Sequence, residues 1–150
     1  FPNCRYIMID IPPALYVAQR YLSSLFPQKR IADVRCTDSP EEIAAKVSEA
    51  DIAFLLPHQA AALPPRSVDL FLNISSLHEM QPEQIAAYLQ MIDRLTAGLF
   101  YSKQWIESRN PYDEIVVRRT DYPIPSHWRQ IYNRPAQVQT TFFEALYATD

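Results

Sequence analysis

Glycine is almost absent from this chain, and its absence restricts what the chain can fold into. The 150 residues include one glycine, Gly98, and 13 prolines. Average usage of about 7% would place roughly ten glycines in a chain of this length. Loops that wrap a phosphate or a cofactor with backbone N–H groups need several glycines close together. A glycine-rich nucleotide loop is therefore excluded from these residues, and so is the glycine-flanked nucleophile elbow of serine hydrolases.

Composition and charge exclude several classes of protein. Hydrophobic residues make up 48% of the chain and charged residues 21%, as in a globular domain and not in a disordered one. The net charge of −3 leaves no basic face for nucleic acid. No apolar run approaches the roughly 20 residues of a membrane span. Cys4 and Cys36 lack the spacing of a metal site. We expect a cytoplasmic protein with reduced cysteines, and leave open whether it forms a homo-oligomer.

Short apolar runs alternate with amphipathic segments along the first hundred residues. Four runs are nearly continuous in apolar residues, as buried parallel strands are: 6–11, 52–56, 69–74 and 99–101. Apolar residues recur at helical spacing over 12–26 and 82–95. Ser39 and Glu42 have the spacing of a capping box that opens a helix over 40–49. This alternation predicts an α/β, Rossmann-like fold with a mostly parallel sheet and helices on both faces.

Beyond residue 104 turn-forming residues become frequent. Three further runs are predicted as strands: 115–117, 128–132 and 138–147. We expect the last two to pair as an antiparallel hairpin at one side of the sheet. Gly98 follows the helix predicted over 82–95, so we expect it to form the left-handed C-cap of that helix. A short extended piece over 31–35 is also expected.

An acidic residue ends the first predicted strand. Asp10 follows Tyr6-Ile7-Met8-Ile9, and in open α/β sheets ligands bind beyond the carboxyl ends of the strands. A carboxylate in this place accepts hydrogen bonds from both ribose hydroxyls of a nucleotide. Asp10 and the adjacent Ile11 are therefore predicted to bind a nucleoside cofactor. The alternative is that Asp10 caps the helix that begins at Pro12 or Pro13.

Polar residues are concentrated between the third predicted strand and the helix after it, in Asn73-Ile-Ser-Ser-Leu-His-Glu-Met80. Loops on a rigid scaffold carry function disproportionately often. His78 and Glu79 are the candidate general bases, with Asn73 as a cofactor contact and Ser76 as a substrate contact. The alternative is that Ser75, Ser76 and Glu79 only cap the following helix.

Other candidates lie at the ends of neighbouring strands or near the C-terminus. His58 follows the run 52–56 and is predicted to contact the adenine of a cofactor. Gln104 follows the run 99–101 and is predicted to contact substrate. His127-Trp128-Arg129 is a further possible substrate contact, although Trp128 is more simply explained as a core residue. The three histidines are too dispersed for a metal site, so no metal is predicted.

These segments together resemble the bacterial sugar O-methyltransferases, a branch of the class I S-adenosylmethionine-dependent methyltransferases. The most specific segment is Asp69-Leu-Phe-Leu-Asn-Ile-Ser-Ser-Leu-His-Glu-Met80, which is similar to the family's Asn-x-x-Ser-x-x-Glu-Met stretch. The segments 6–12, 54–59 and 143–147 also look alike, so the likeness covers nearly the whole chain. In the methyltransferase version of the doubly wound fold the last strand inserts antiparallel, as expected here.

The resemblance implies S-adenosylmethionine as the cofactor and a sugar or glycan hydroxyl as the methyl acceptor. It implies that Asp10 holds the ribose and that His78 or Glu79 serves as the base. It also implies that the first strand of this chain is the family's second. The family's first strand and glycine loop would then precede Phe1, and the 150 residues would form one partial domain.

Other functions remain open at this point. An NAD-dependent sugar-modifying oxidoreductase would bind ribose with the same acid. A Rossmann module that has lost its loop could serve in assembly without catalysis. A methyltransferase for a non-sugar acceptor would share every feature described above.

Overall fold

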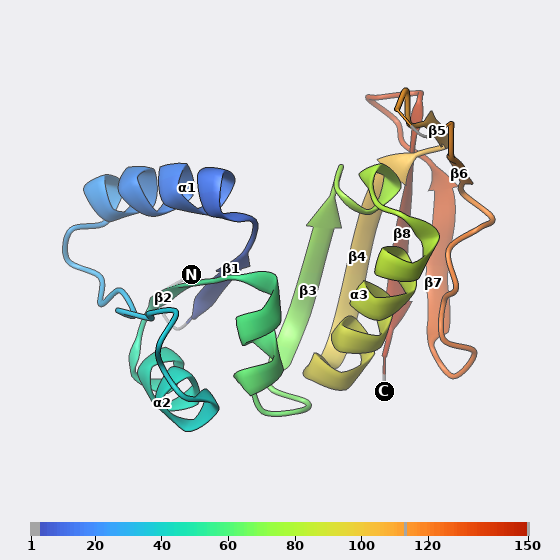
Figure 1. Cartoon of the computed structure of the whole chain (residues 1–150). Helices are drawn as coiled ribbons and strands as arrows, with labels where there is room; N and C mark the ends of the chain where they lie inside the picture. Colours follow the sequence, from blue (N-terminus) through green and yellow to red (C-terminus); the bar gives the residue numbers. More distant parts are fainter. Residues whose placement is uncertain (1–3, 113, 150) are drawn as a thin grey trace. The chain divides into compact units, whose positions relative to one another are not determined.

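The computed structural model describes residues 4–112 and 114–149, and it divides into two units, 1–64 and 65–150 (Figure 1). The first unit contains β1 (Tyr6–Ile9), α1 (Pro12–Leu25), α2 (Pro40–Glu49), β2 (Ile52–Leu55) and the 3₁₀ helix η1 (Pro57–Ala62). The second contains β3 (Val68–Ile74), the 3₁₀ helix η2 (Leu77–Glu79), α3 (Pro82–Leu95), β4 (Thr96–Trp105), β5 (Glu107–Arg109), β6 (Val116–Arg118), β7 (Arg129–Pro135) and β8 (Phe142–Ala148).

The first unit is built on a parallel pair of strands. β1 and β2 run side by side, with Tyr6 opposite Ile52 and Ile9 opposite Leu55. All four residues of β2 are buried, as the continuous apolar run predicts. The capping box before α2 is confirmed: Ser39 Oγ accepts from the Glu42 N–H at 3.2 Å, and Glu42 Oε2 accepts from the Ser39 N–H at 2.7 Å. The extended piece expected over 31–35 is only an isolated bridge from Ile31 to β2.

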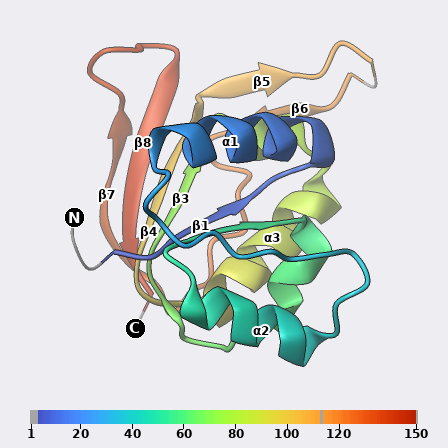
Figure 2. The ribbon, with the colours of Figure 1, turned by 90° about the vertical axis from the view of Figure 1, so that its left-hand side faces the viewer.

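The second unit is a mixed sheet in the order β3-β4-β8-β7. β3 and β4 are parallel, whereas β8 is antiparallel to both of its neighbours, β4 and β7. Figures 1 and 2 show α3 along one side of this sheet. The helical stripe predicted from the sequence is confirmed, because Ile85, Leu89, Ile92 and Leu95 are all buried. Ile85, Leu89 and Ile92 belong to an aromatic core that includes Phe100, Trp128, Phe143 and Tyr147. The predicted α/β class and its C-terminal hairpin are confirmed.

Gly98 does not cap a helix. It lies inside β4, which begins at Thr96 directly after α3, and no glycine among the described residues has a positive φ. A Cβ built on Gly98 would lie 2.4 Å from the backbone oxygen of Asp69 on β3. The expected C-cap was therefore wrong. Glycine is needed at this position because the two strand backbones approach too closely for any side chain.

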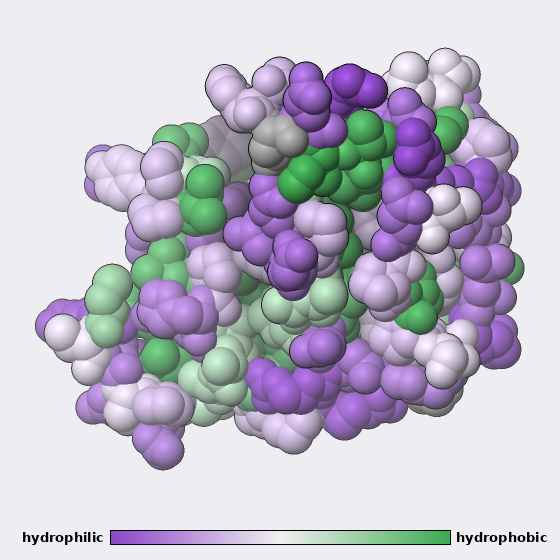
Figure 3. All heavy atoms as spheres, turned by 45° about the vertical axis from the view of Figure 1, so that its right-hand side comes forward, coloured by the Kyte–Doolittle hydropathy of each residue, from purple (hydrophilic) through white to green (hydrophobic). Residues whose placement is uncertain are grey.

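Several apolar side chains are exposed. α1 has no buried residue, and its Tyr16 and Val17 are 63% and 66% exposed. On β3, Leu70, Leu72 and Ile74 share one face and are 50%, 51% and 55% exposed. Figure 3 shows patches of hydrophobic residues between hydrophilic ones on the face that it displays. No helix within 4–112 and 114–149 combines the length and apolar character needed to cross a bilayer.

Candidate functional site

In the first unit, Asp10 and His58 follow the two parallel strands. Asp10 comes directly after β1 and His58 is the second residue of η1, which follows β2. Because β1 and β2 are parallel neighbours, their carboxyl ends open at the same edge of the pair. His58 and Ile11 are exposed, with Ile11 at 60%. The structure therefore places the three residues of this unit that were predicted to bind a cofactor at one edge.

The carboxylate of Asp10 does not cap α1. The N-cap residue of this helix is Ile11, and its side chain makes no capping hydrogen bond. Asp10 Oδ1 instead accepts a hydrogen bond from the N–H of the adjacent Ile11 at 2.8 Å. A carboxylate has room for further donors beyond this one bond. The capping explanation of Asp10 is thus not supported, whereas ribose binding stays a prediction.

In the second unit, one buried amide joins most of the predicted residues. Gln104 lies on β4, is 0% exposed, and contacts the segment that follows β3. Its Oε1 accepts from the Ser76 N–H at 3.1 Å and lies 3.0 Å from His78 Nδ1. Its Nε2 donates to Asn73 Oδ1 at 2.7 Å and to the Asn73 carbonyl at 3.1 Å. Asn73, Ser76, His78 and Gln104 therefore form one cluster at the carboxyl end of the parallel pair β3–β4.

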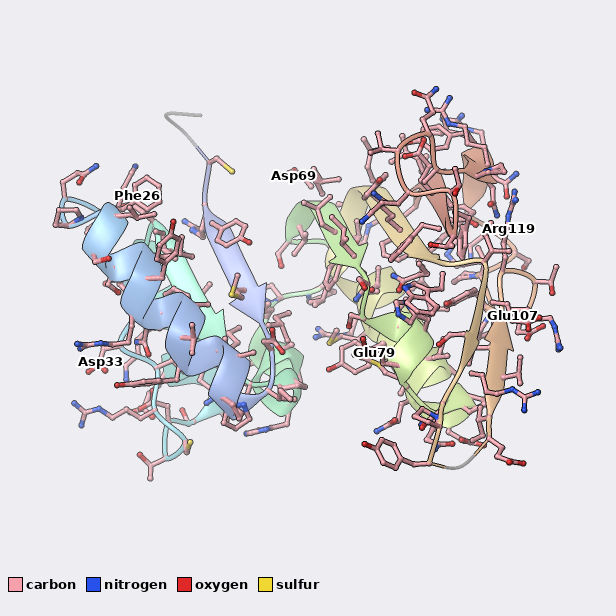
Figure 4. The ribbon with its side chains drawn as sticks, turned by 90° about the horizontal axis from the view of Figure 1, so that it is seen from above. Phe26, Asp33, Asp69, Glu79, Glu107 and Arg119 are labelled. Atoms are coloured by element: carbon pink, nitrogen blue, oxygen red, sulfur yellow. The ribbon has the colours of Figure 1, made fainter. Side chains whose placement is uncertain are left out.

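The His78 ring is held between aromatic side chains. His78 is 5% exposed, and its ring stacks on Trp105 with a centroid distance of 5.5 Å and an interplanar angle of 27°. Phe142 meets the same ring edge-on at 6.2 Å. Nε2 of His78 lies 3.9 Å from Glu79 Oε1, whose side chain is 71% exposed. The ring edge that carries Nε2 thus faces an exposed carboxylate. Figure 4 labels this residue, Glu79, which lies just before α3.

The turn after β3 has an unusual backbone. Ser75 has φ of 54°, in the left-handed region that non-glycine residues seldom adopt. The turn brings the N–H groups of Ser76 and His78 to the same acceptor, Gln104 Oε1, at 3.1 and 3.5 Å. Strained backbone of this kind tends to occur at functional sites.

The residues of this turn do not cap α3, which was the alternative explanation for them. The N-cap residue of α3 is Gln81, and its backbone N–H is bonded by Gln84 Oε1 at 3.0 Å. Ser75, Ser76 and Glu79 therefore need another explanation. Their roles in a site remain predictions.

The explanation of Trp128 as a core residue is confirmed, and its neighbour His127 shares its hydrogen-bond partner. Trp128 is a core residue: it is 6% exposed, and its Nε1 donates to Asp93 Oδ1 at 2.6 Å. The same oxygen lies 2.8 Å from Nε2 of the neighbouring His127. Trp105, which stacks on His78, was not singled out from the sequence. Its only signal is its position next to Gln104 at the end of an apolar strand.

No metal centre is apparent in the described part of the chain. Among residues 4–112 and 114–149, no three histidine, cysteine, aspartate or glutamate side chains gather as metal ligands. Cys4 and Cys36 are both exposed and free.

Comparison with known proteins bears on the fold. No protein-family model matches the sequence, and no curated protein matches it. The chain is similar to the solved structure of the PH0226 protein from Pyrococcus horikoshii OT3, with 12% identity, a TM-score of 0.54, and coverage of 96% of this chain and 81% of that one. It is also similar to a putative type 11 methyltransferase from Sulfolobus solfataricus, with 18% identity, a TM-score of 0.50, and coverage of 98% and 85%. At these identities the likeness shows a shared fold, the Rossmann-like fold that the sequence predicts.

Proposed function

We propose that this chain is part of a class I S-adenosylmethionine-dependent methyltransferase that acts on a hydroxyl of a sugar or glycan. One observation supports the cofactor most directly: Asp10 ends a strand of a parallel pair, and its carboxylate does not cap the following helix. The fold shared with a protein described as a methyltransferase agrees with this choice. The similarity of Asn73-Ile-Ser-Ser-Leu-His-Glu-Met80 to the sugar O-methyltransferases supports the acceptor.

The residues divide between the cofactor and the acceptor. Asp10 would accept hydrogen bonds from the ribose hydroxyls, and Ile11 and His58 would lie beside the nucleoside. Asn73 would orient the reactants at the end of β3, with Ser76 beside the acceptor. When bound, S-adenosylmethionine supplies an electrophilic methyl group. Most of the rate enhancement would come from alignment of the acceptor oxygen, and a sugar hydroxyl also needs a base, for which His78 and Glu79 are the candidates.

We also propose that a further strand and helix, outside these 150 residues, complete the domain. β3 is the end strand of its sheet, and Leu70, Leu72 and Ile74 leave an apolar surface next to that edge. Proteins normally cover such edges and surfaces. The glycine loop that a nucleoside cofactor needs is absent from the present residues, and the added unit would supply it.

Calorimetry tests the cofactor assignment. Titration of the complete protein with S-adenosylmethionine should give binding that Asp10→Ala weakens by roughly 10- to 100-fold, because hydrogen bonds to a charged group contribute about 1.5–3 kcal/mol. Asp33→Ala is the matched control, since Asp33 is an exposed acid of the same unit that pairs with Arg35. An affinity for Asp10→Ala equal to that of the control would remove Asp10 from the site.

The same protein separates the competing functions. Thermal shifts with S-adenosylmethionine and with NAD would distinguish a methyltransferase from an oxidoreductase, because ligand binding raises the unfolding temperature. A shift with NAD alone would overturn the proposal. No shift with either compound would favour a module without catalysis.

A further inference from the structure

We infer that Gln104 is a positioning residue that holds His78 in the tautomer protonated on Nδ1, so that Nε2 is the atom that accepts the proton of the acceptor hydroxyl. This inference rests on the proposed methyl transfer for the last step alone. The tautomer itself follows from hydrogen bonds within the second unit.

The orientation of the Gln104 amide is determined by its neighbours. Nε2 lies next to three oxygens: Asn73 Oδ1 at 2.7 Å, the Asn73 carbonyl at 3.1 Å and Ser102 Oγ at 3.3 Å. Oε1 lies next to the backbone N–H groups of Ser76 and His78. A flipped amide would place its N–H groups against two N–H donors and its oxygen against carbonyl oxygens, so only one orientation satisfies the buried groups.

The orientation of the amide decides the protonation of His78. Gln104 Oε1 can only accept, and it lies 3.0 Å from His78 Nδ1, so Nδ1 must carry the hydrogen of that bond. In a neutral imidazole the other nitrogen, Nε2, then carries the lone pair. The tautomer of a catalytic histidine is commonly set in this way, by the bond that its second nitrogen makes.

The surroundings of the ring fit a proton acceptor at Nε2. Stacking on Trp105 and the edge contact with Phe142 restrict rotation of the ring. Glu79 Oε1, 3.9 Å from Nε2, would stabilise the imidazolium that forms. In the step, the acceptor O–H bond breaks and its proton passes to Nε2. The oxygen electron pair forms the new bond to the methyl carbon, and the methyl–sulfur electron pair stays with sulfur.

Nitrogen NMR of the His78 imidazole determines its tautomer independently of any activity assay. Wild-type protein labelled with ¹⁵N in its histidine rings should show His78 protonated on Nδ1 at a pH where the ring is neutral. The chain has three histidines, so loss of a signal in His78→Gln assigns it. A wild-type ring protonated on Nε2 would overturn the inference, whatever the variants do.

Variants separate positioning from substrate contact. Gln104→Met keeps the side-chain length and removes the acceptor, so His78 should lose its single tautomer and kcat should fall by roughly 100-fold, within the range of general-base contributions, with little change in KM for the acceptor. Gln90→Met on the exposed face of α3 is the control and should change neither quantity. A rise in KM with an unchanged tautomer would overturn the positioning role and indicate direct contact with substrate. If wild-type protein transfers no methyl group but has the expected tautomer, the proposed function fails and the role of Gln104 in setting the tautomer stands.

Discussion

The two units organise their candidate residues in different ways. In residues 1–64, Asp10 and His58 share a sheet edge, and the one hydrogen bond described for the Asp10 carboxylate is with the next backbone N–H. In residues 65–150, the buried Gln104 connects Asn73, Ser76 and His78 through hydrogen bonds of 2.7–3.1 Å. The first arrangement leaves a carboxylate with capacity for a ligand, whereas in the second the polar groups are hydrogen-bonded to one another.

The two arrangements suit two different tasks, catalysis and the binding of a ligand. Catalytic groups benefit from being held in place in advance, because the protein then needs no rearrangement during the reaction. A residue that binds a ligand needs unused hydrogen-bonding capacity instead. The packing follows the same division: α1 has no buried residue, whereas α3 and the sheet beside it enclose an aromatic core.

The largest expected change in the free energy of unfolding distinguishes the packing of the aromatic core from the packing of α1. Phe100 is 0% exposed, and the centroid of its ring lies 5.4 Å from that of Trp128 and 6.2 Å from that of Tyr147. Phe100→Ala should lower the free energy of unfolding by about 3–5 kcal/mol. Tyr16→Ala on α1, at a residue that is 63% exposed, should change it by about 0.5 kcal/mol or less. Urea unfolding measures both, and equal losses would mean that α1 is packed as firmly as the aromatic core.

A smaller loss of stability is expected for a substitution at the point where β3 and β4 approach each other. Gly98→Ala places a methyl group against the Asp69 carbonyl, and backbone cannot yield as a flexible side chain can. We expect a loss of about 1–3 kcal/mol, typical of overpacking. Ala97→Ser, at the exposed neighbouring residue, is the control and should be nearly neutral. If Gly98→Ala unfolds at the same urea concentration as the control, the close approach of the strands does not explain why glycine is found at this position.

The smallest effects on stability are expected at the extremes of pH. Asp38 in the first unit should make the protein less stable in acid, whereas Tyr122 in the second unit should make it less stable in alkali. A hydrogen bond from Lys46 lowers the pKa of Asp38 below its usual 3.8. The stability that Asp38 contributes is therefore complete above pH 3.8 and is lost as the pH falls through the lowered pKa. In the second unit, burial raises the pKa of Tyr122 above its usual 10.0, so its contribution is complete below pH 10.0 and is lost as the pH rises through the raised pKa.

Thermal unfolding across pH checks this opposition. Asp38→Asn should reduce the loss of stability in acid and leave the alkaline side unchanged. Tyr122→Phe should do the reverse, and by removing a buried hydroxyl that has no partner among the described residues it should also stabilise the protein by about 1 kcal/mol at neutral pH. Identical pH profiles for the two variants would contradict the assignment of acid and alkaline sensitivity to different units.

Features that depend on neighbours in sequence were predictable. The stripe Ile85, Leu89, Ile92 and Leu95 has helical spacing, and each of these residues is buried. The capping box of Ser39 and Glu42 spans one turn and forms as expected. Asp10 at the end of β1 could be recognised because a strand end is visible in the apolar run before it.

Only the tertiary structure decided what depends on residues far apart in the chain. Gly98 looked like a helix cap, but the atom that requires glycine belongs to Asp69 on another strand. Gln104 looked like a substrate contact, but its amide bonds to residues that lie 26 to 31 positions earlier in the chain. Spacing reports local periodicity, whereas the partner of a buried polar group is selected by which strands pair and in what register. The sequence by itself therefore determined the elements and their order, and the pairing of β3 with β4 decided which side chains meet.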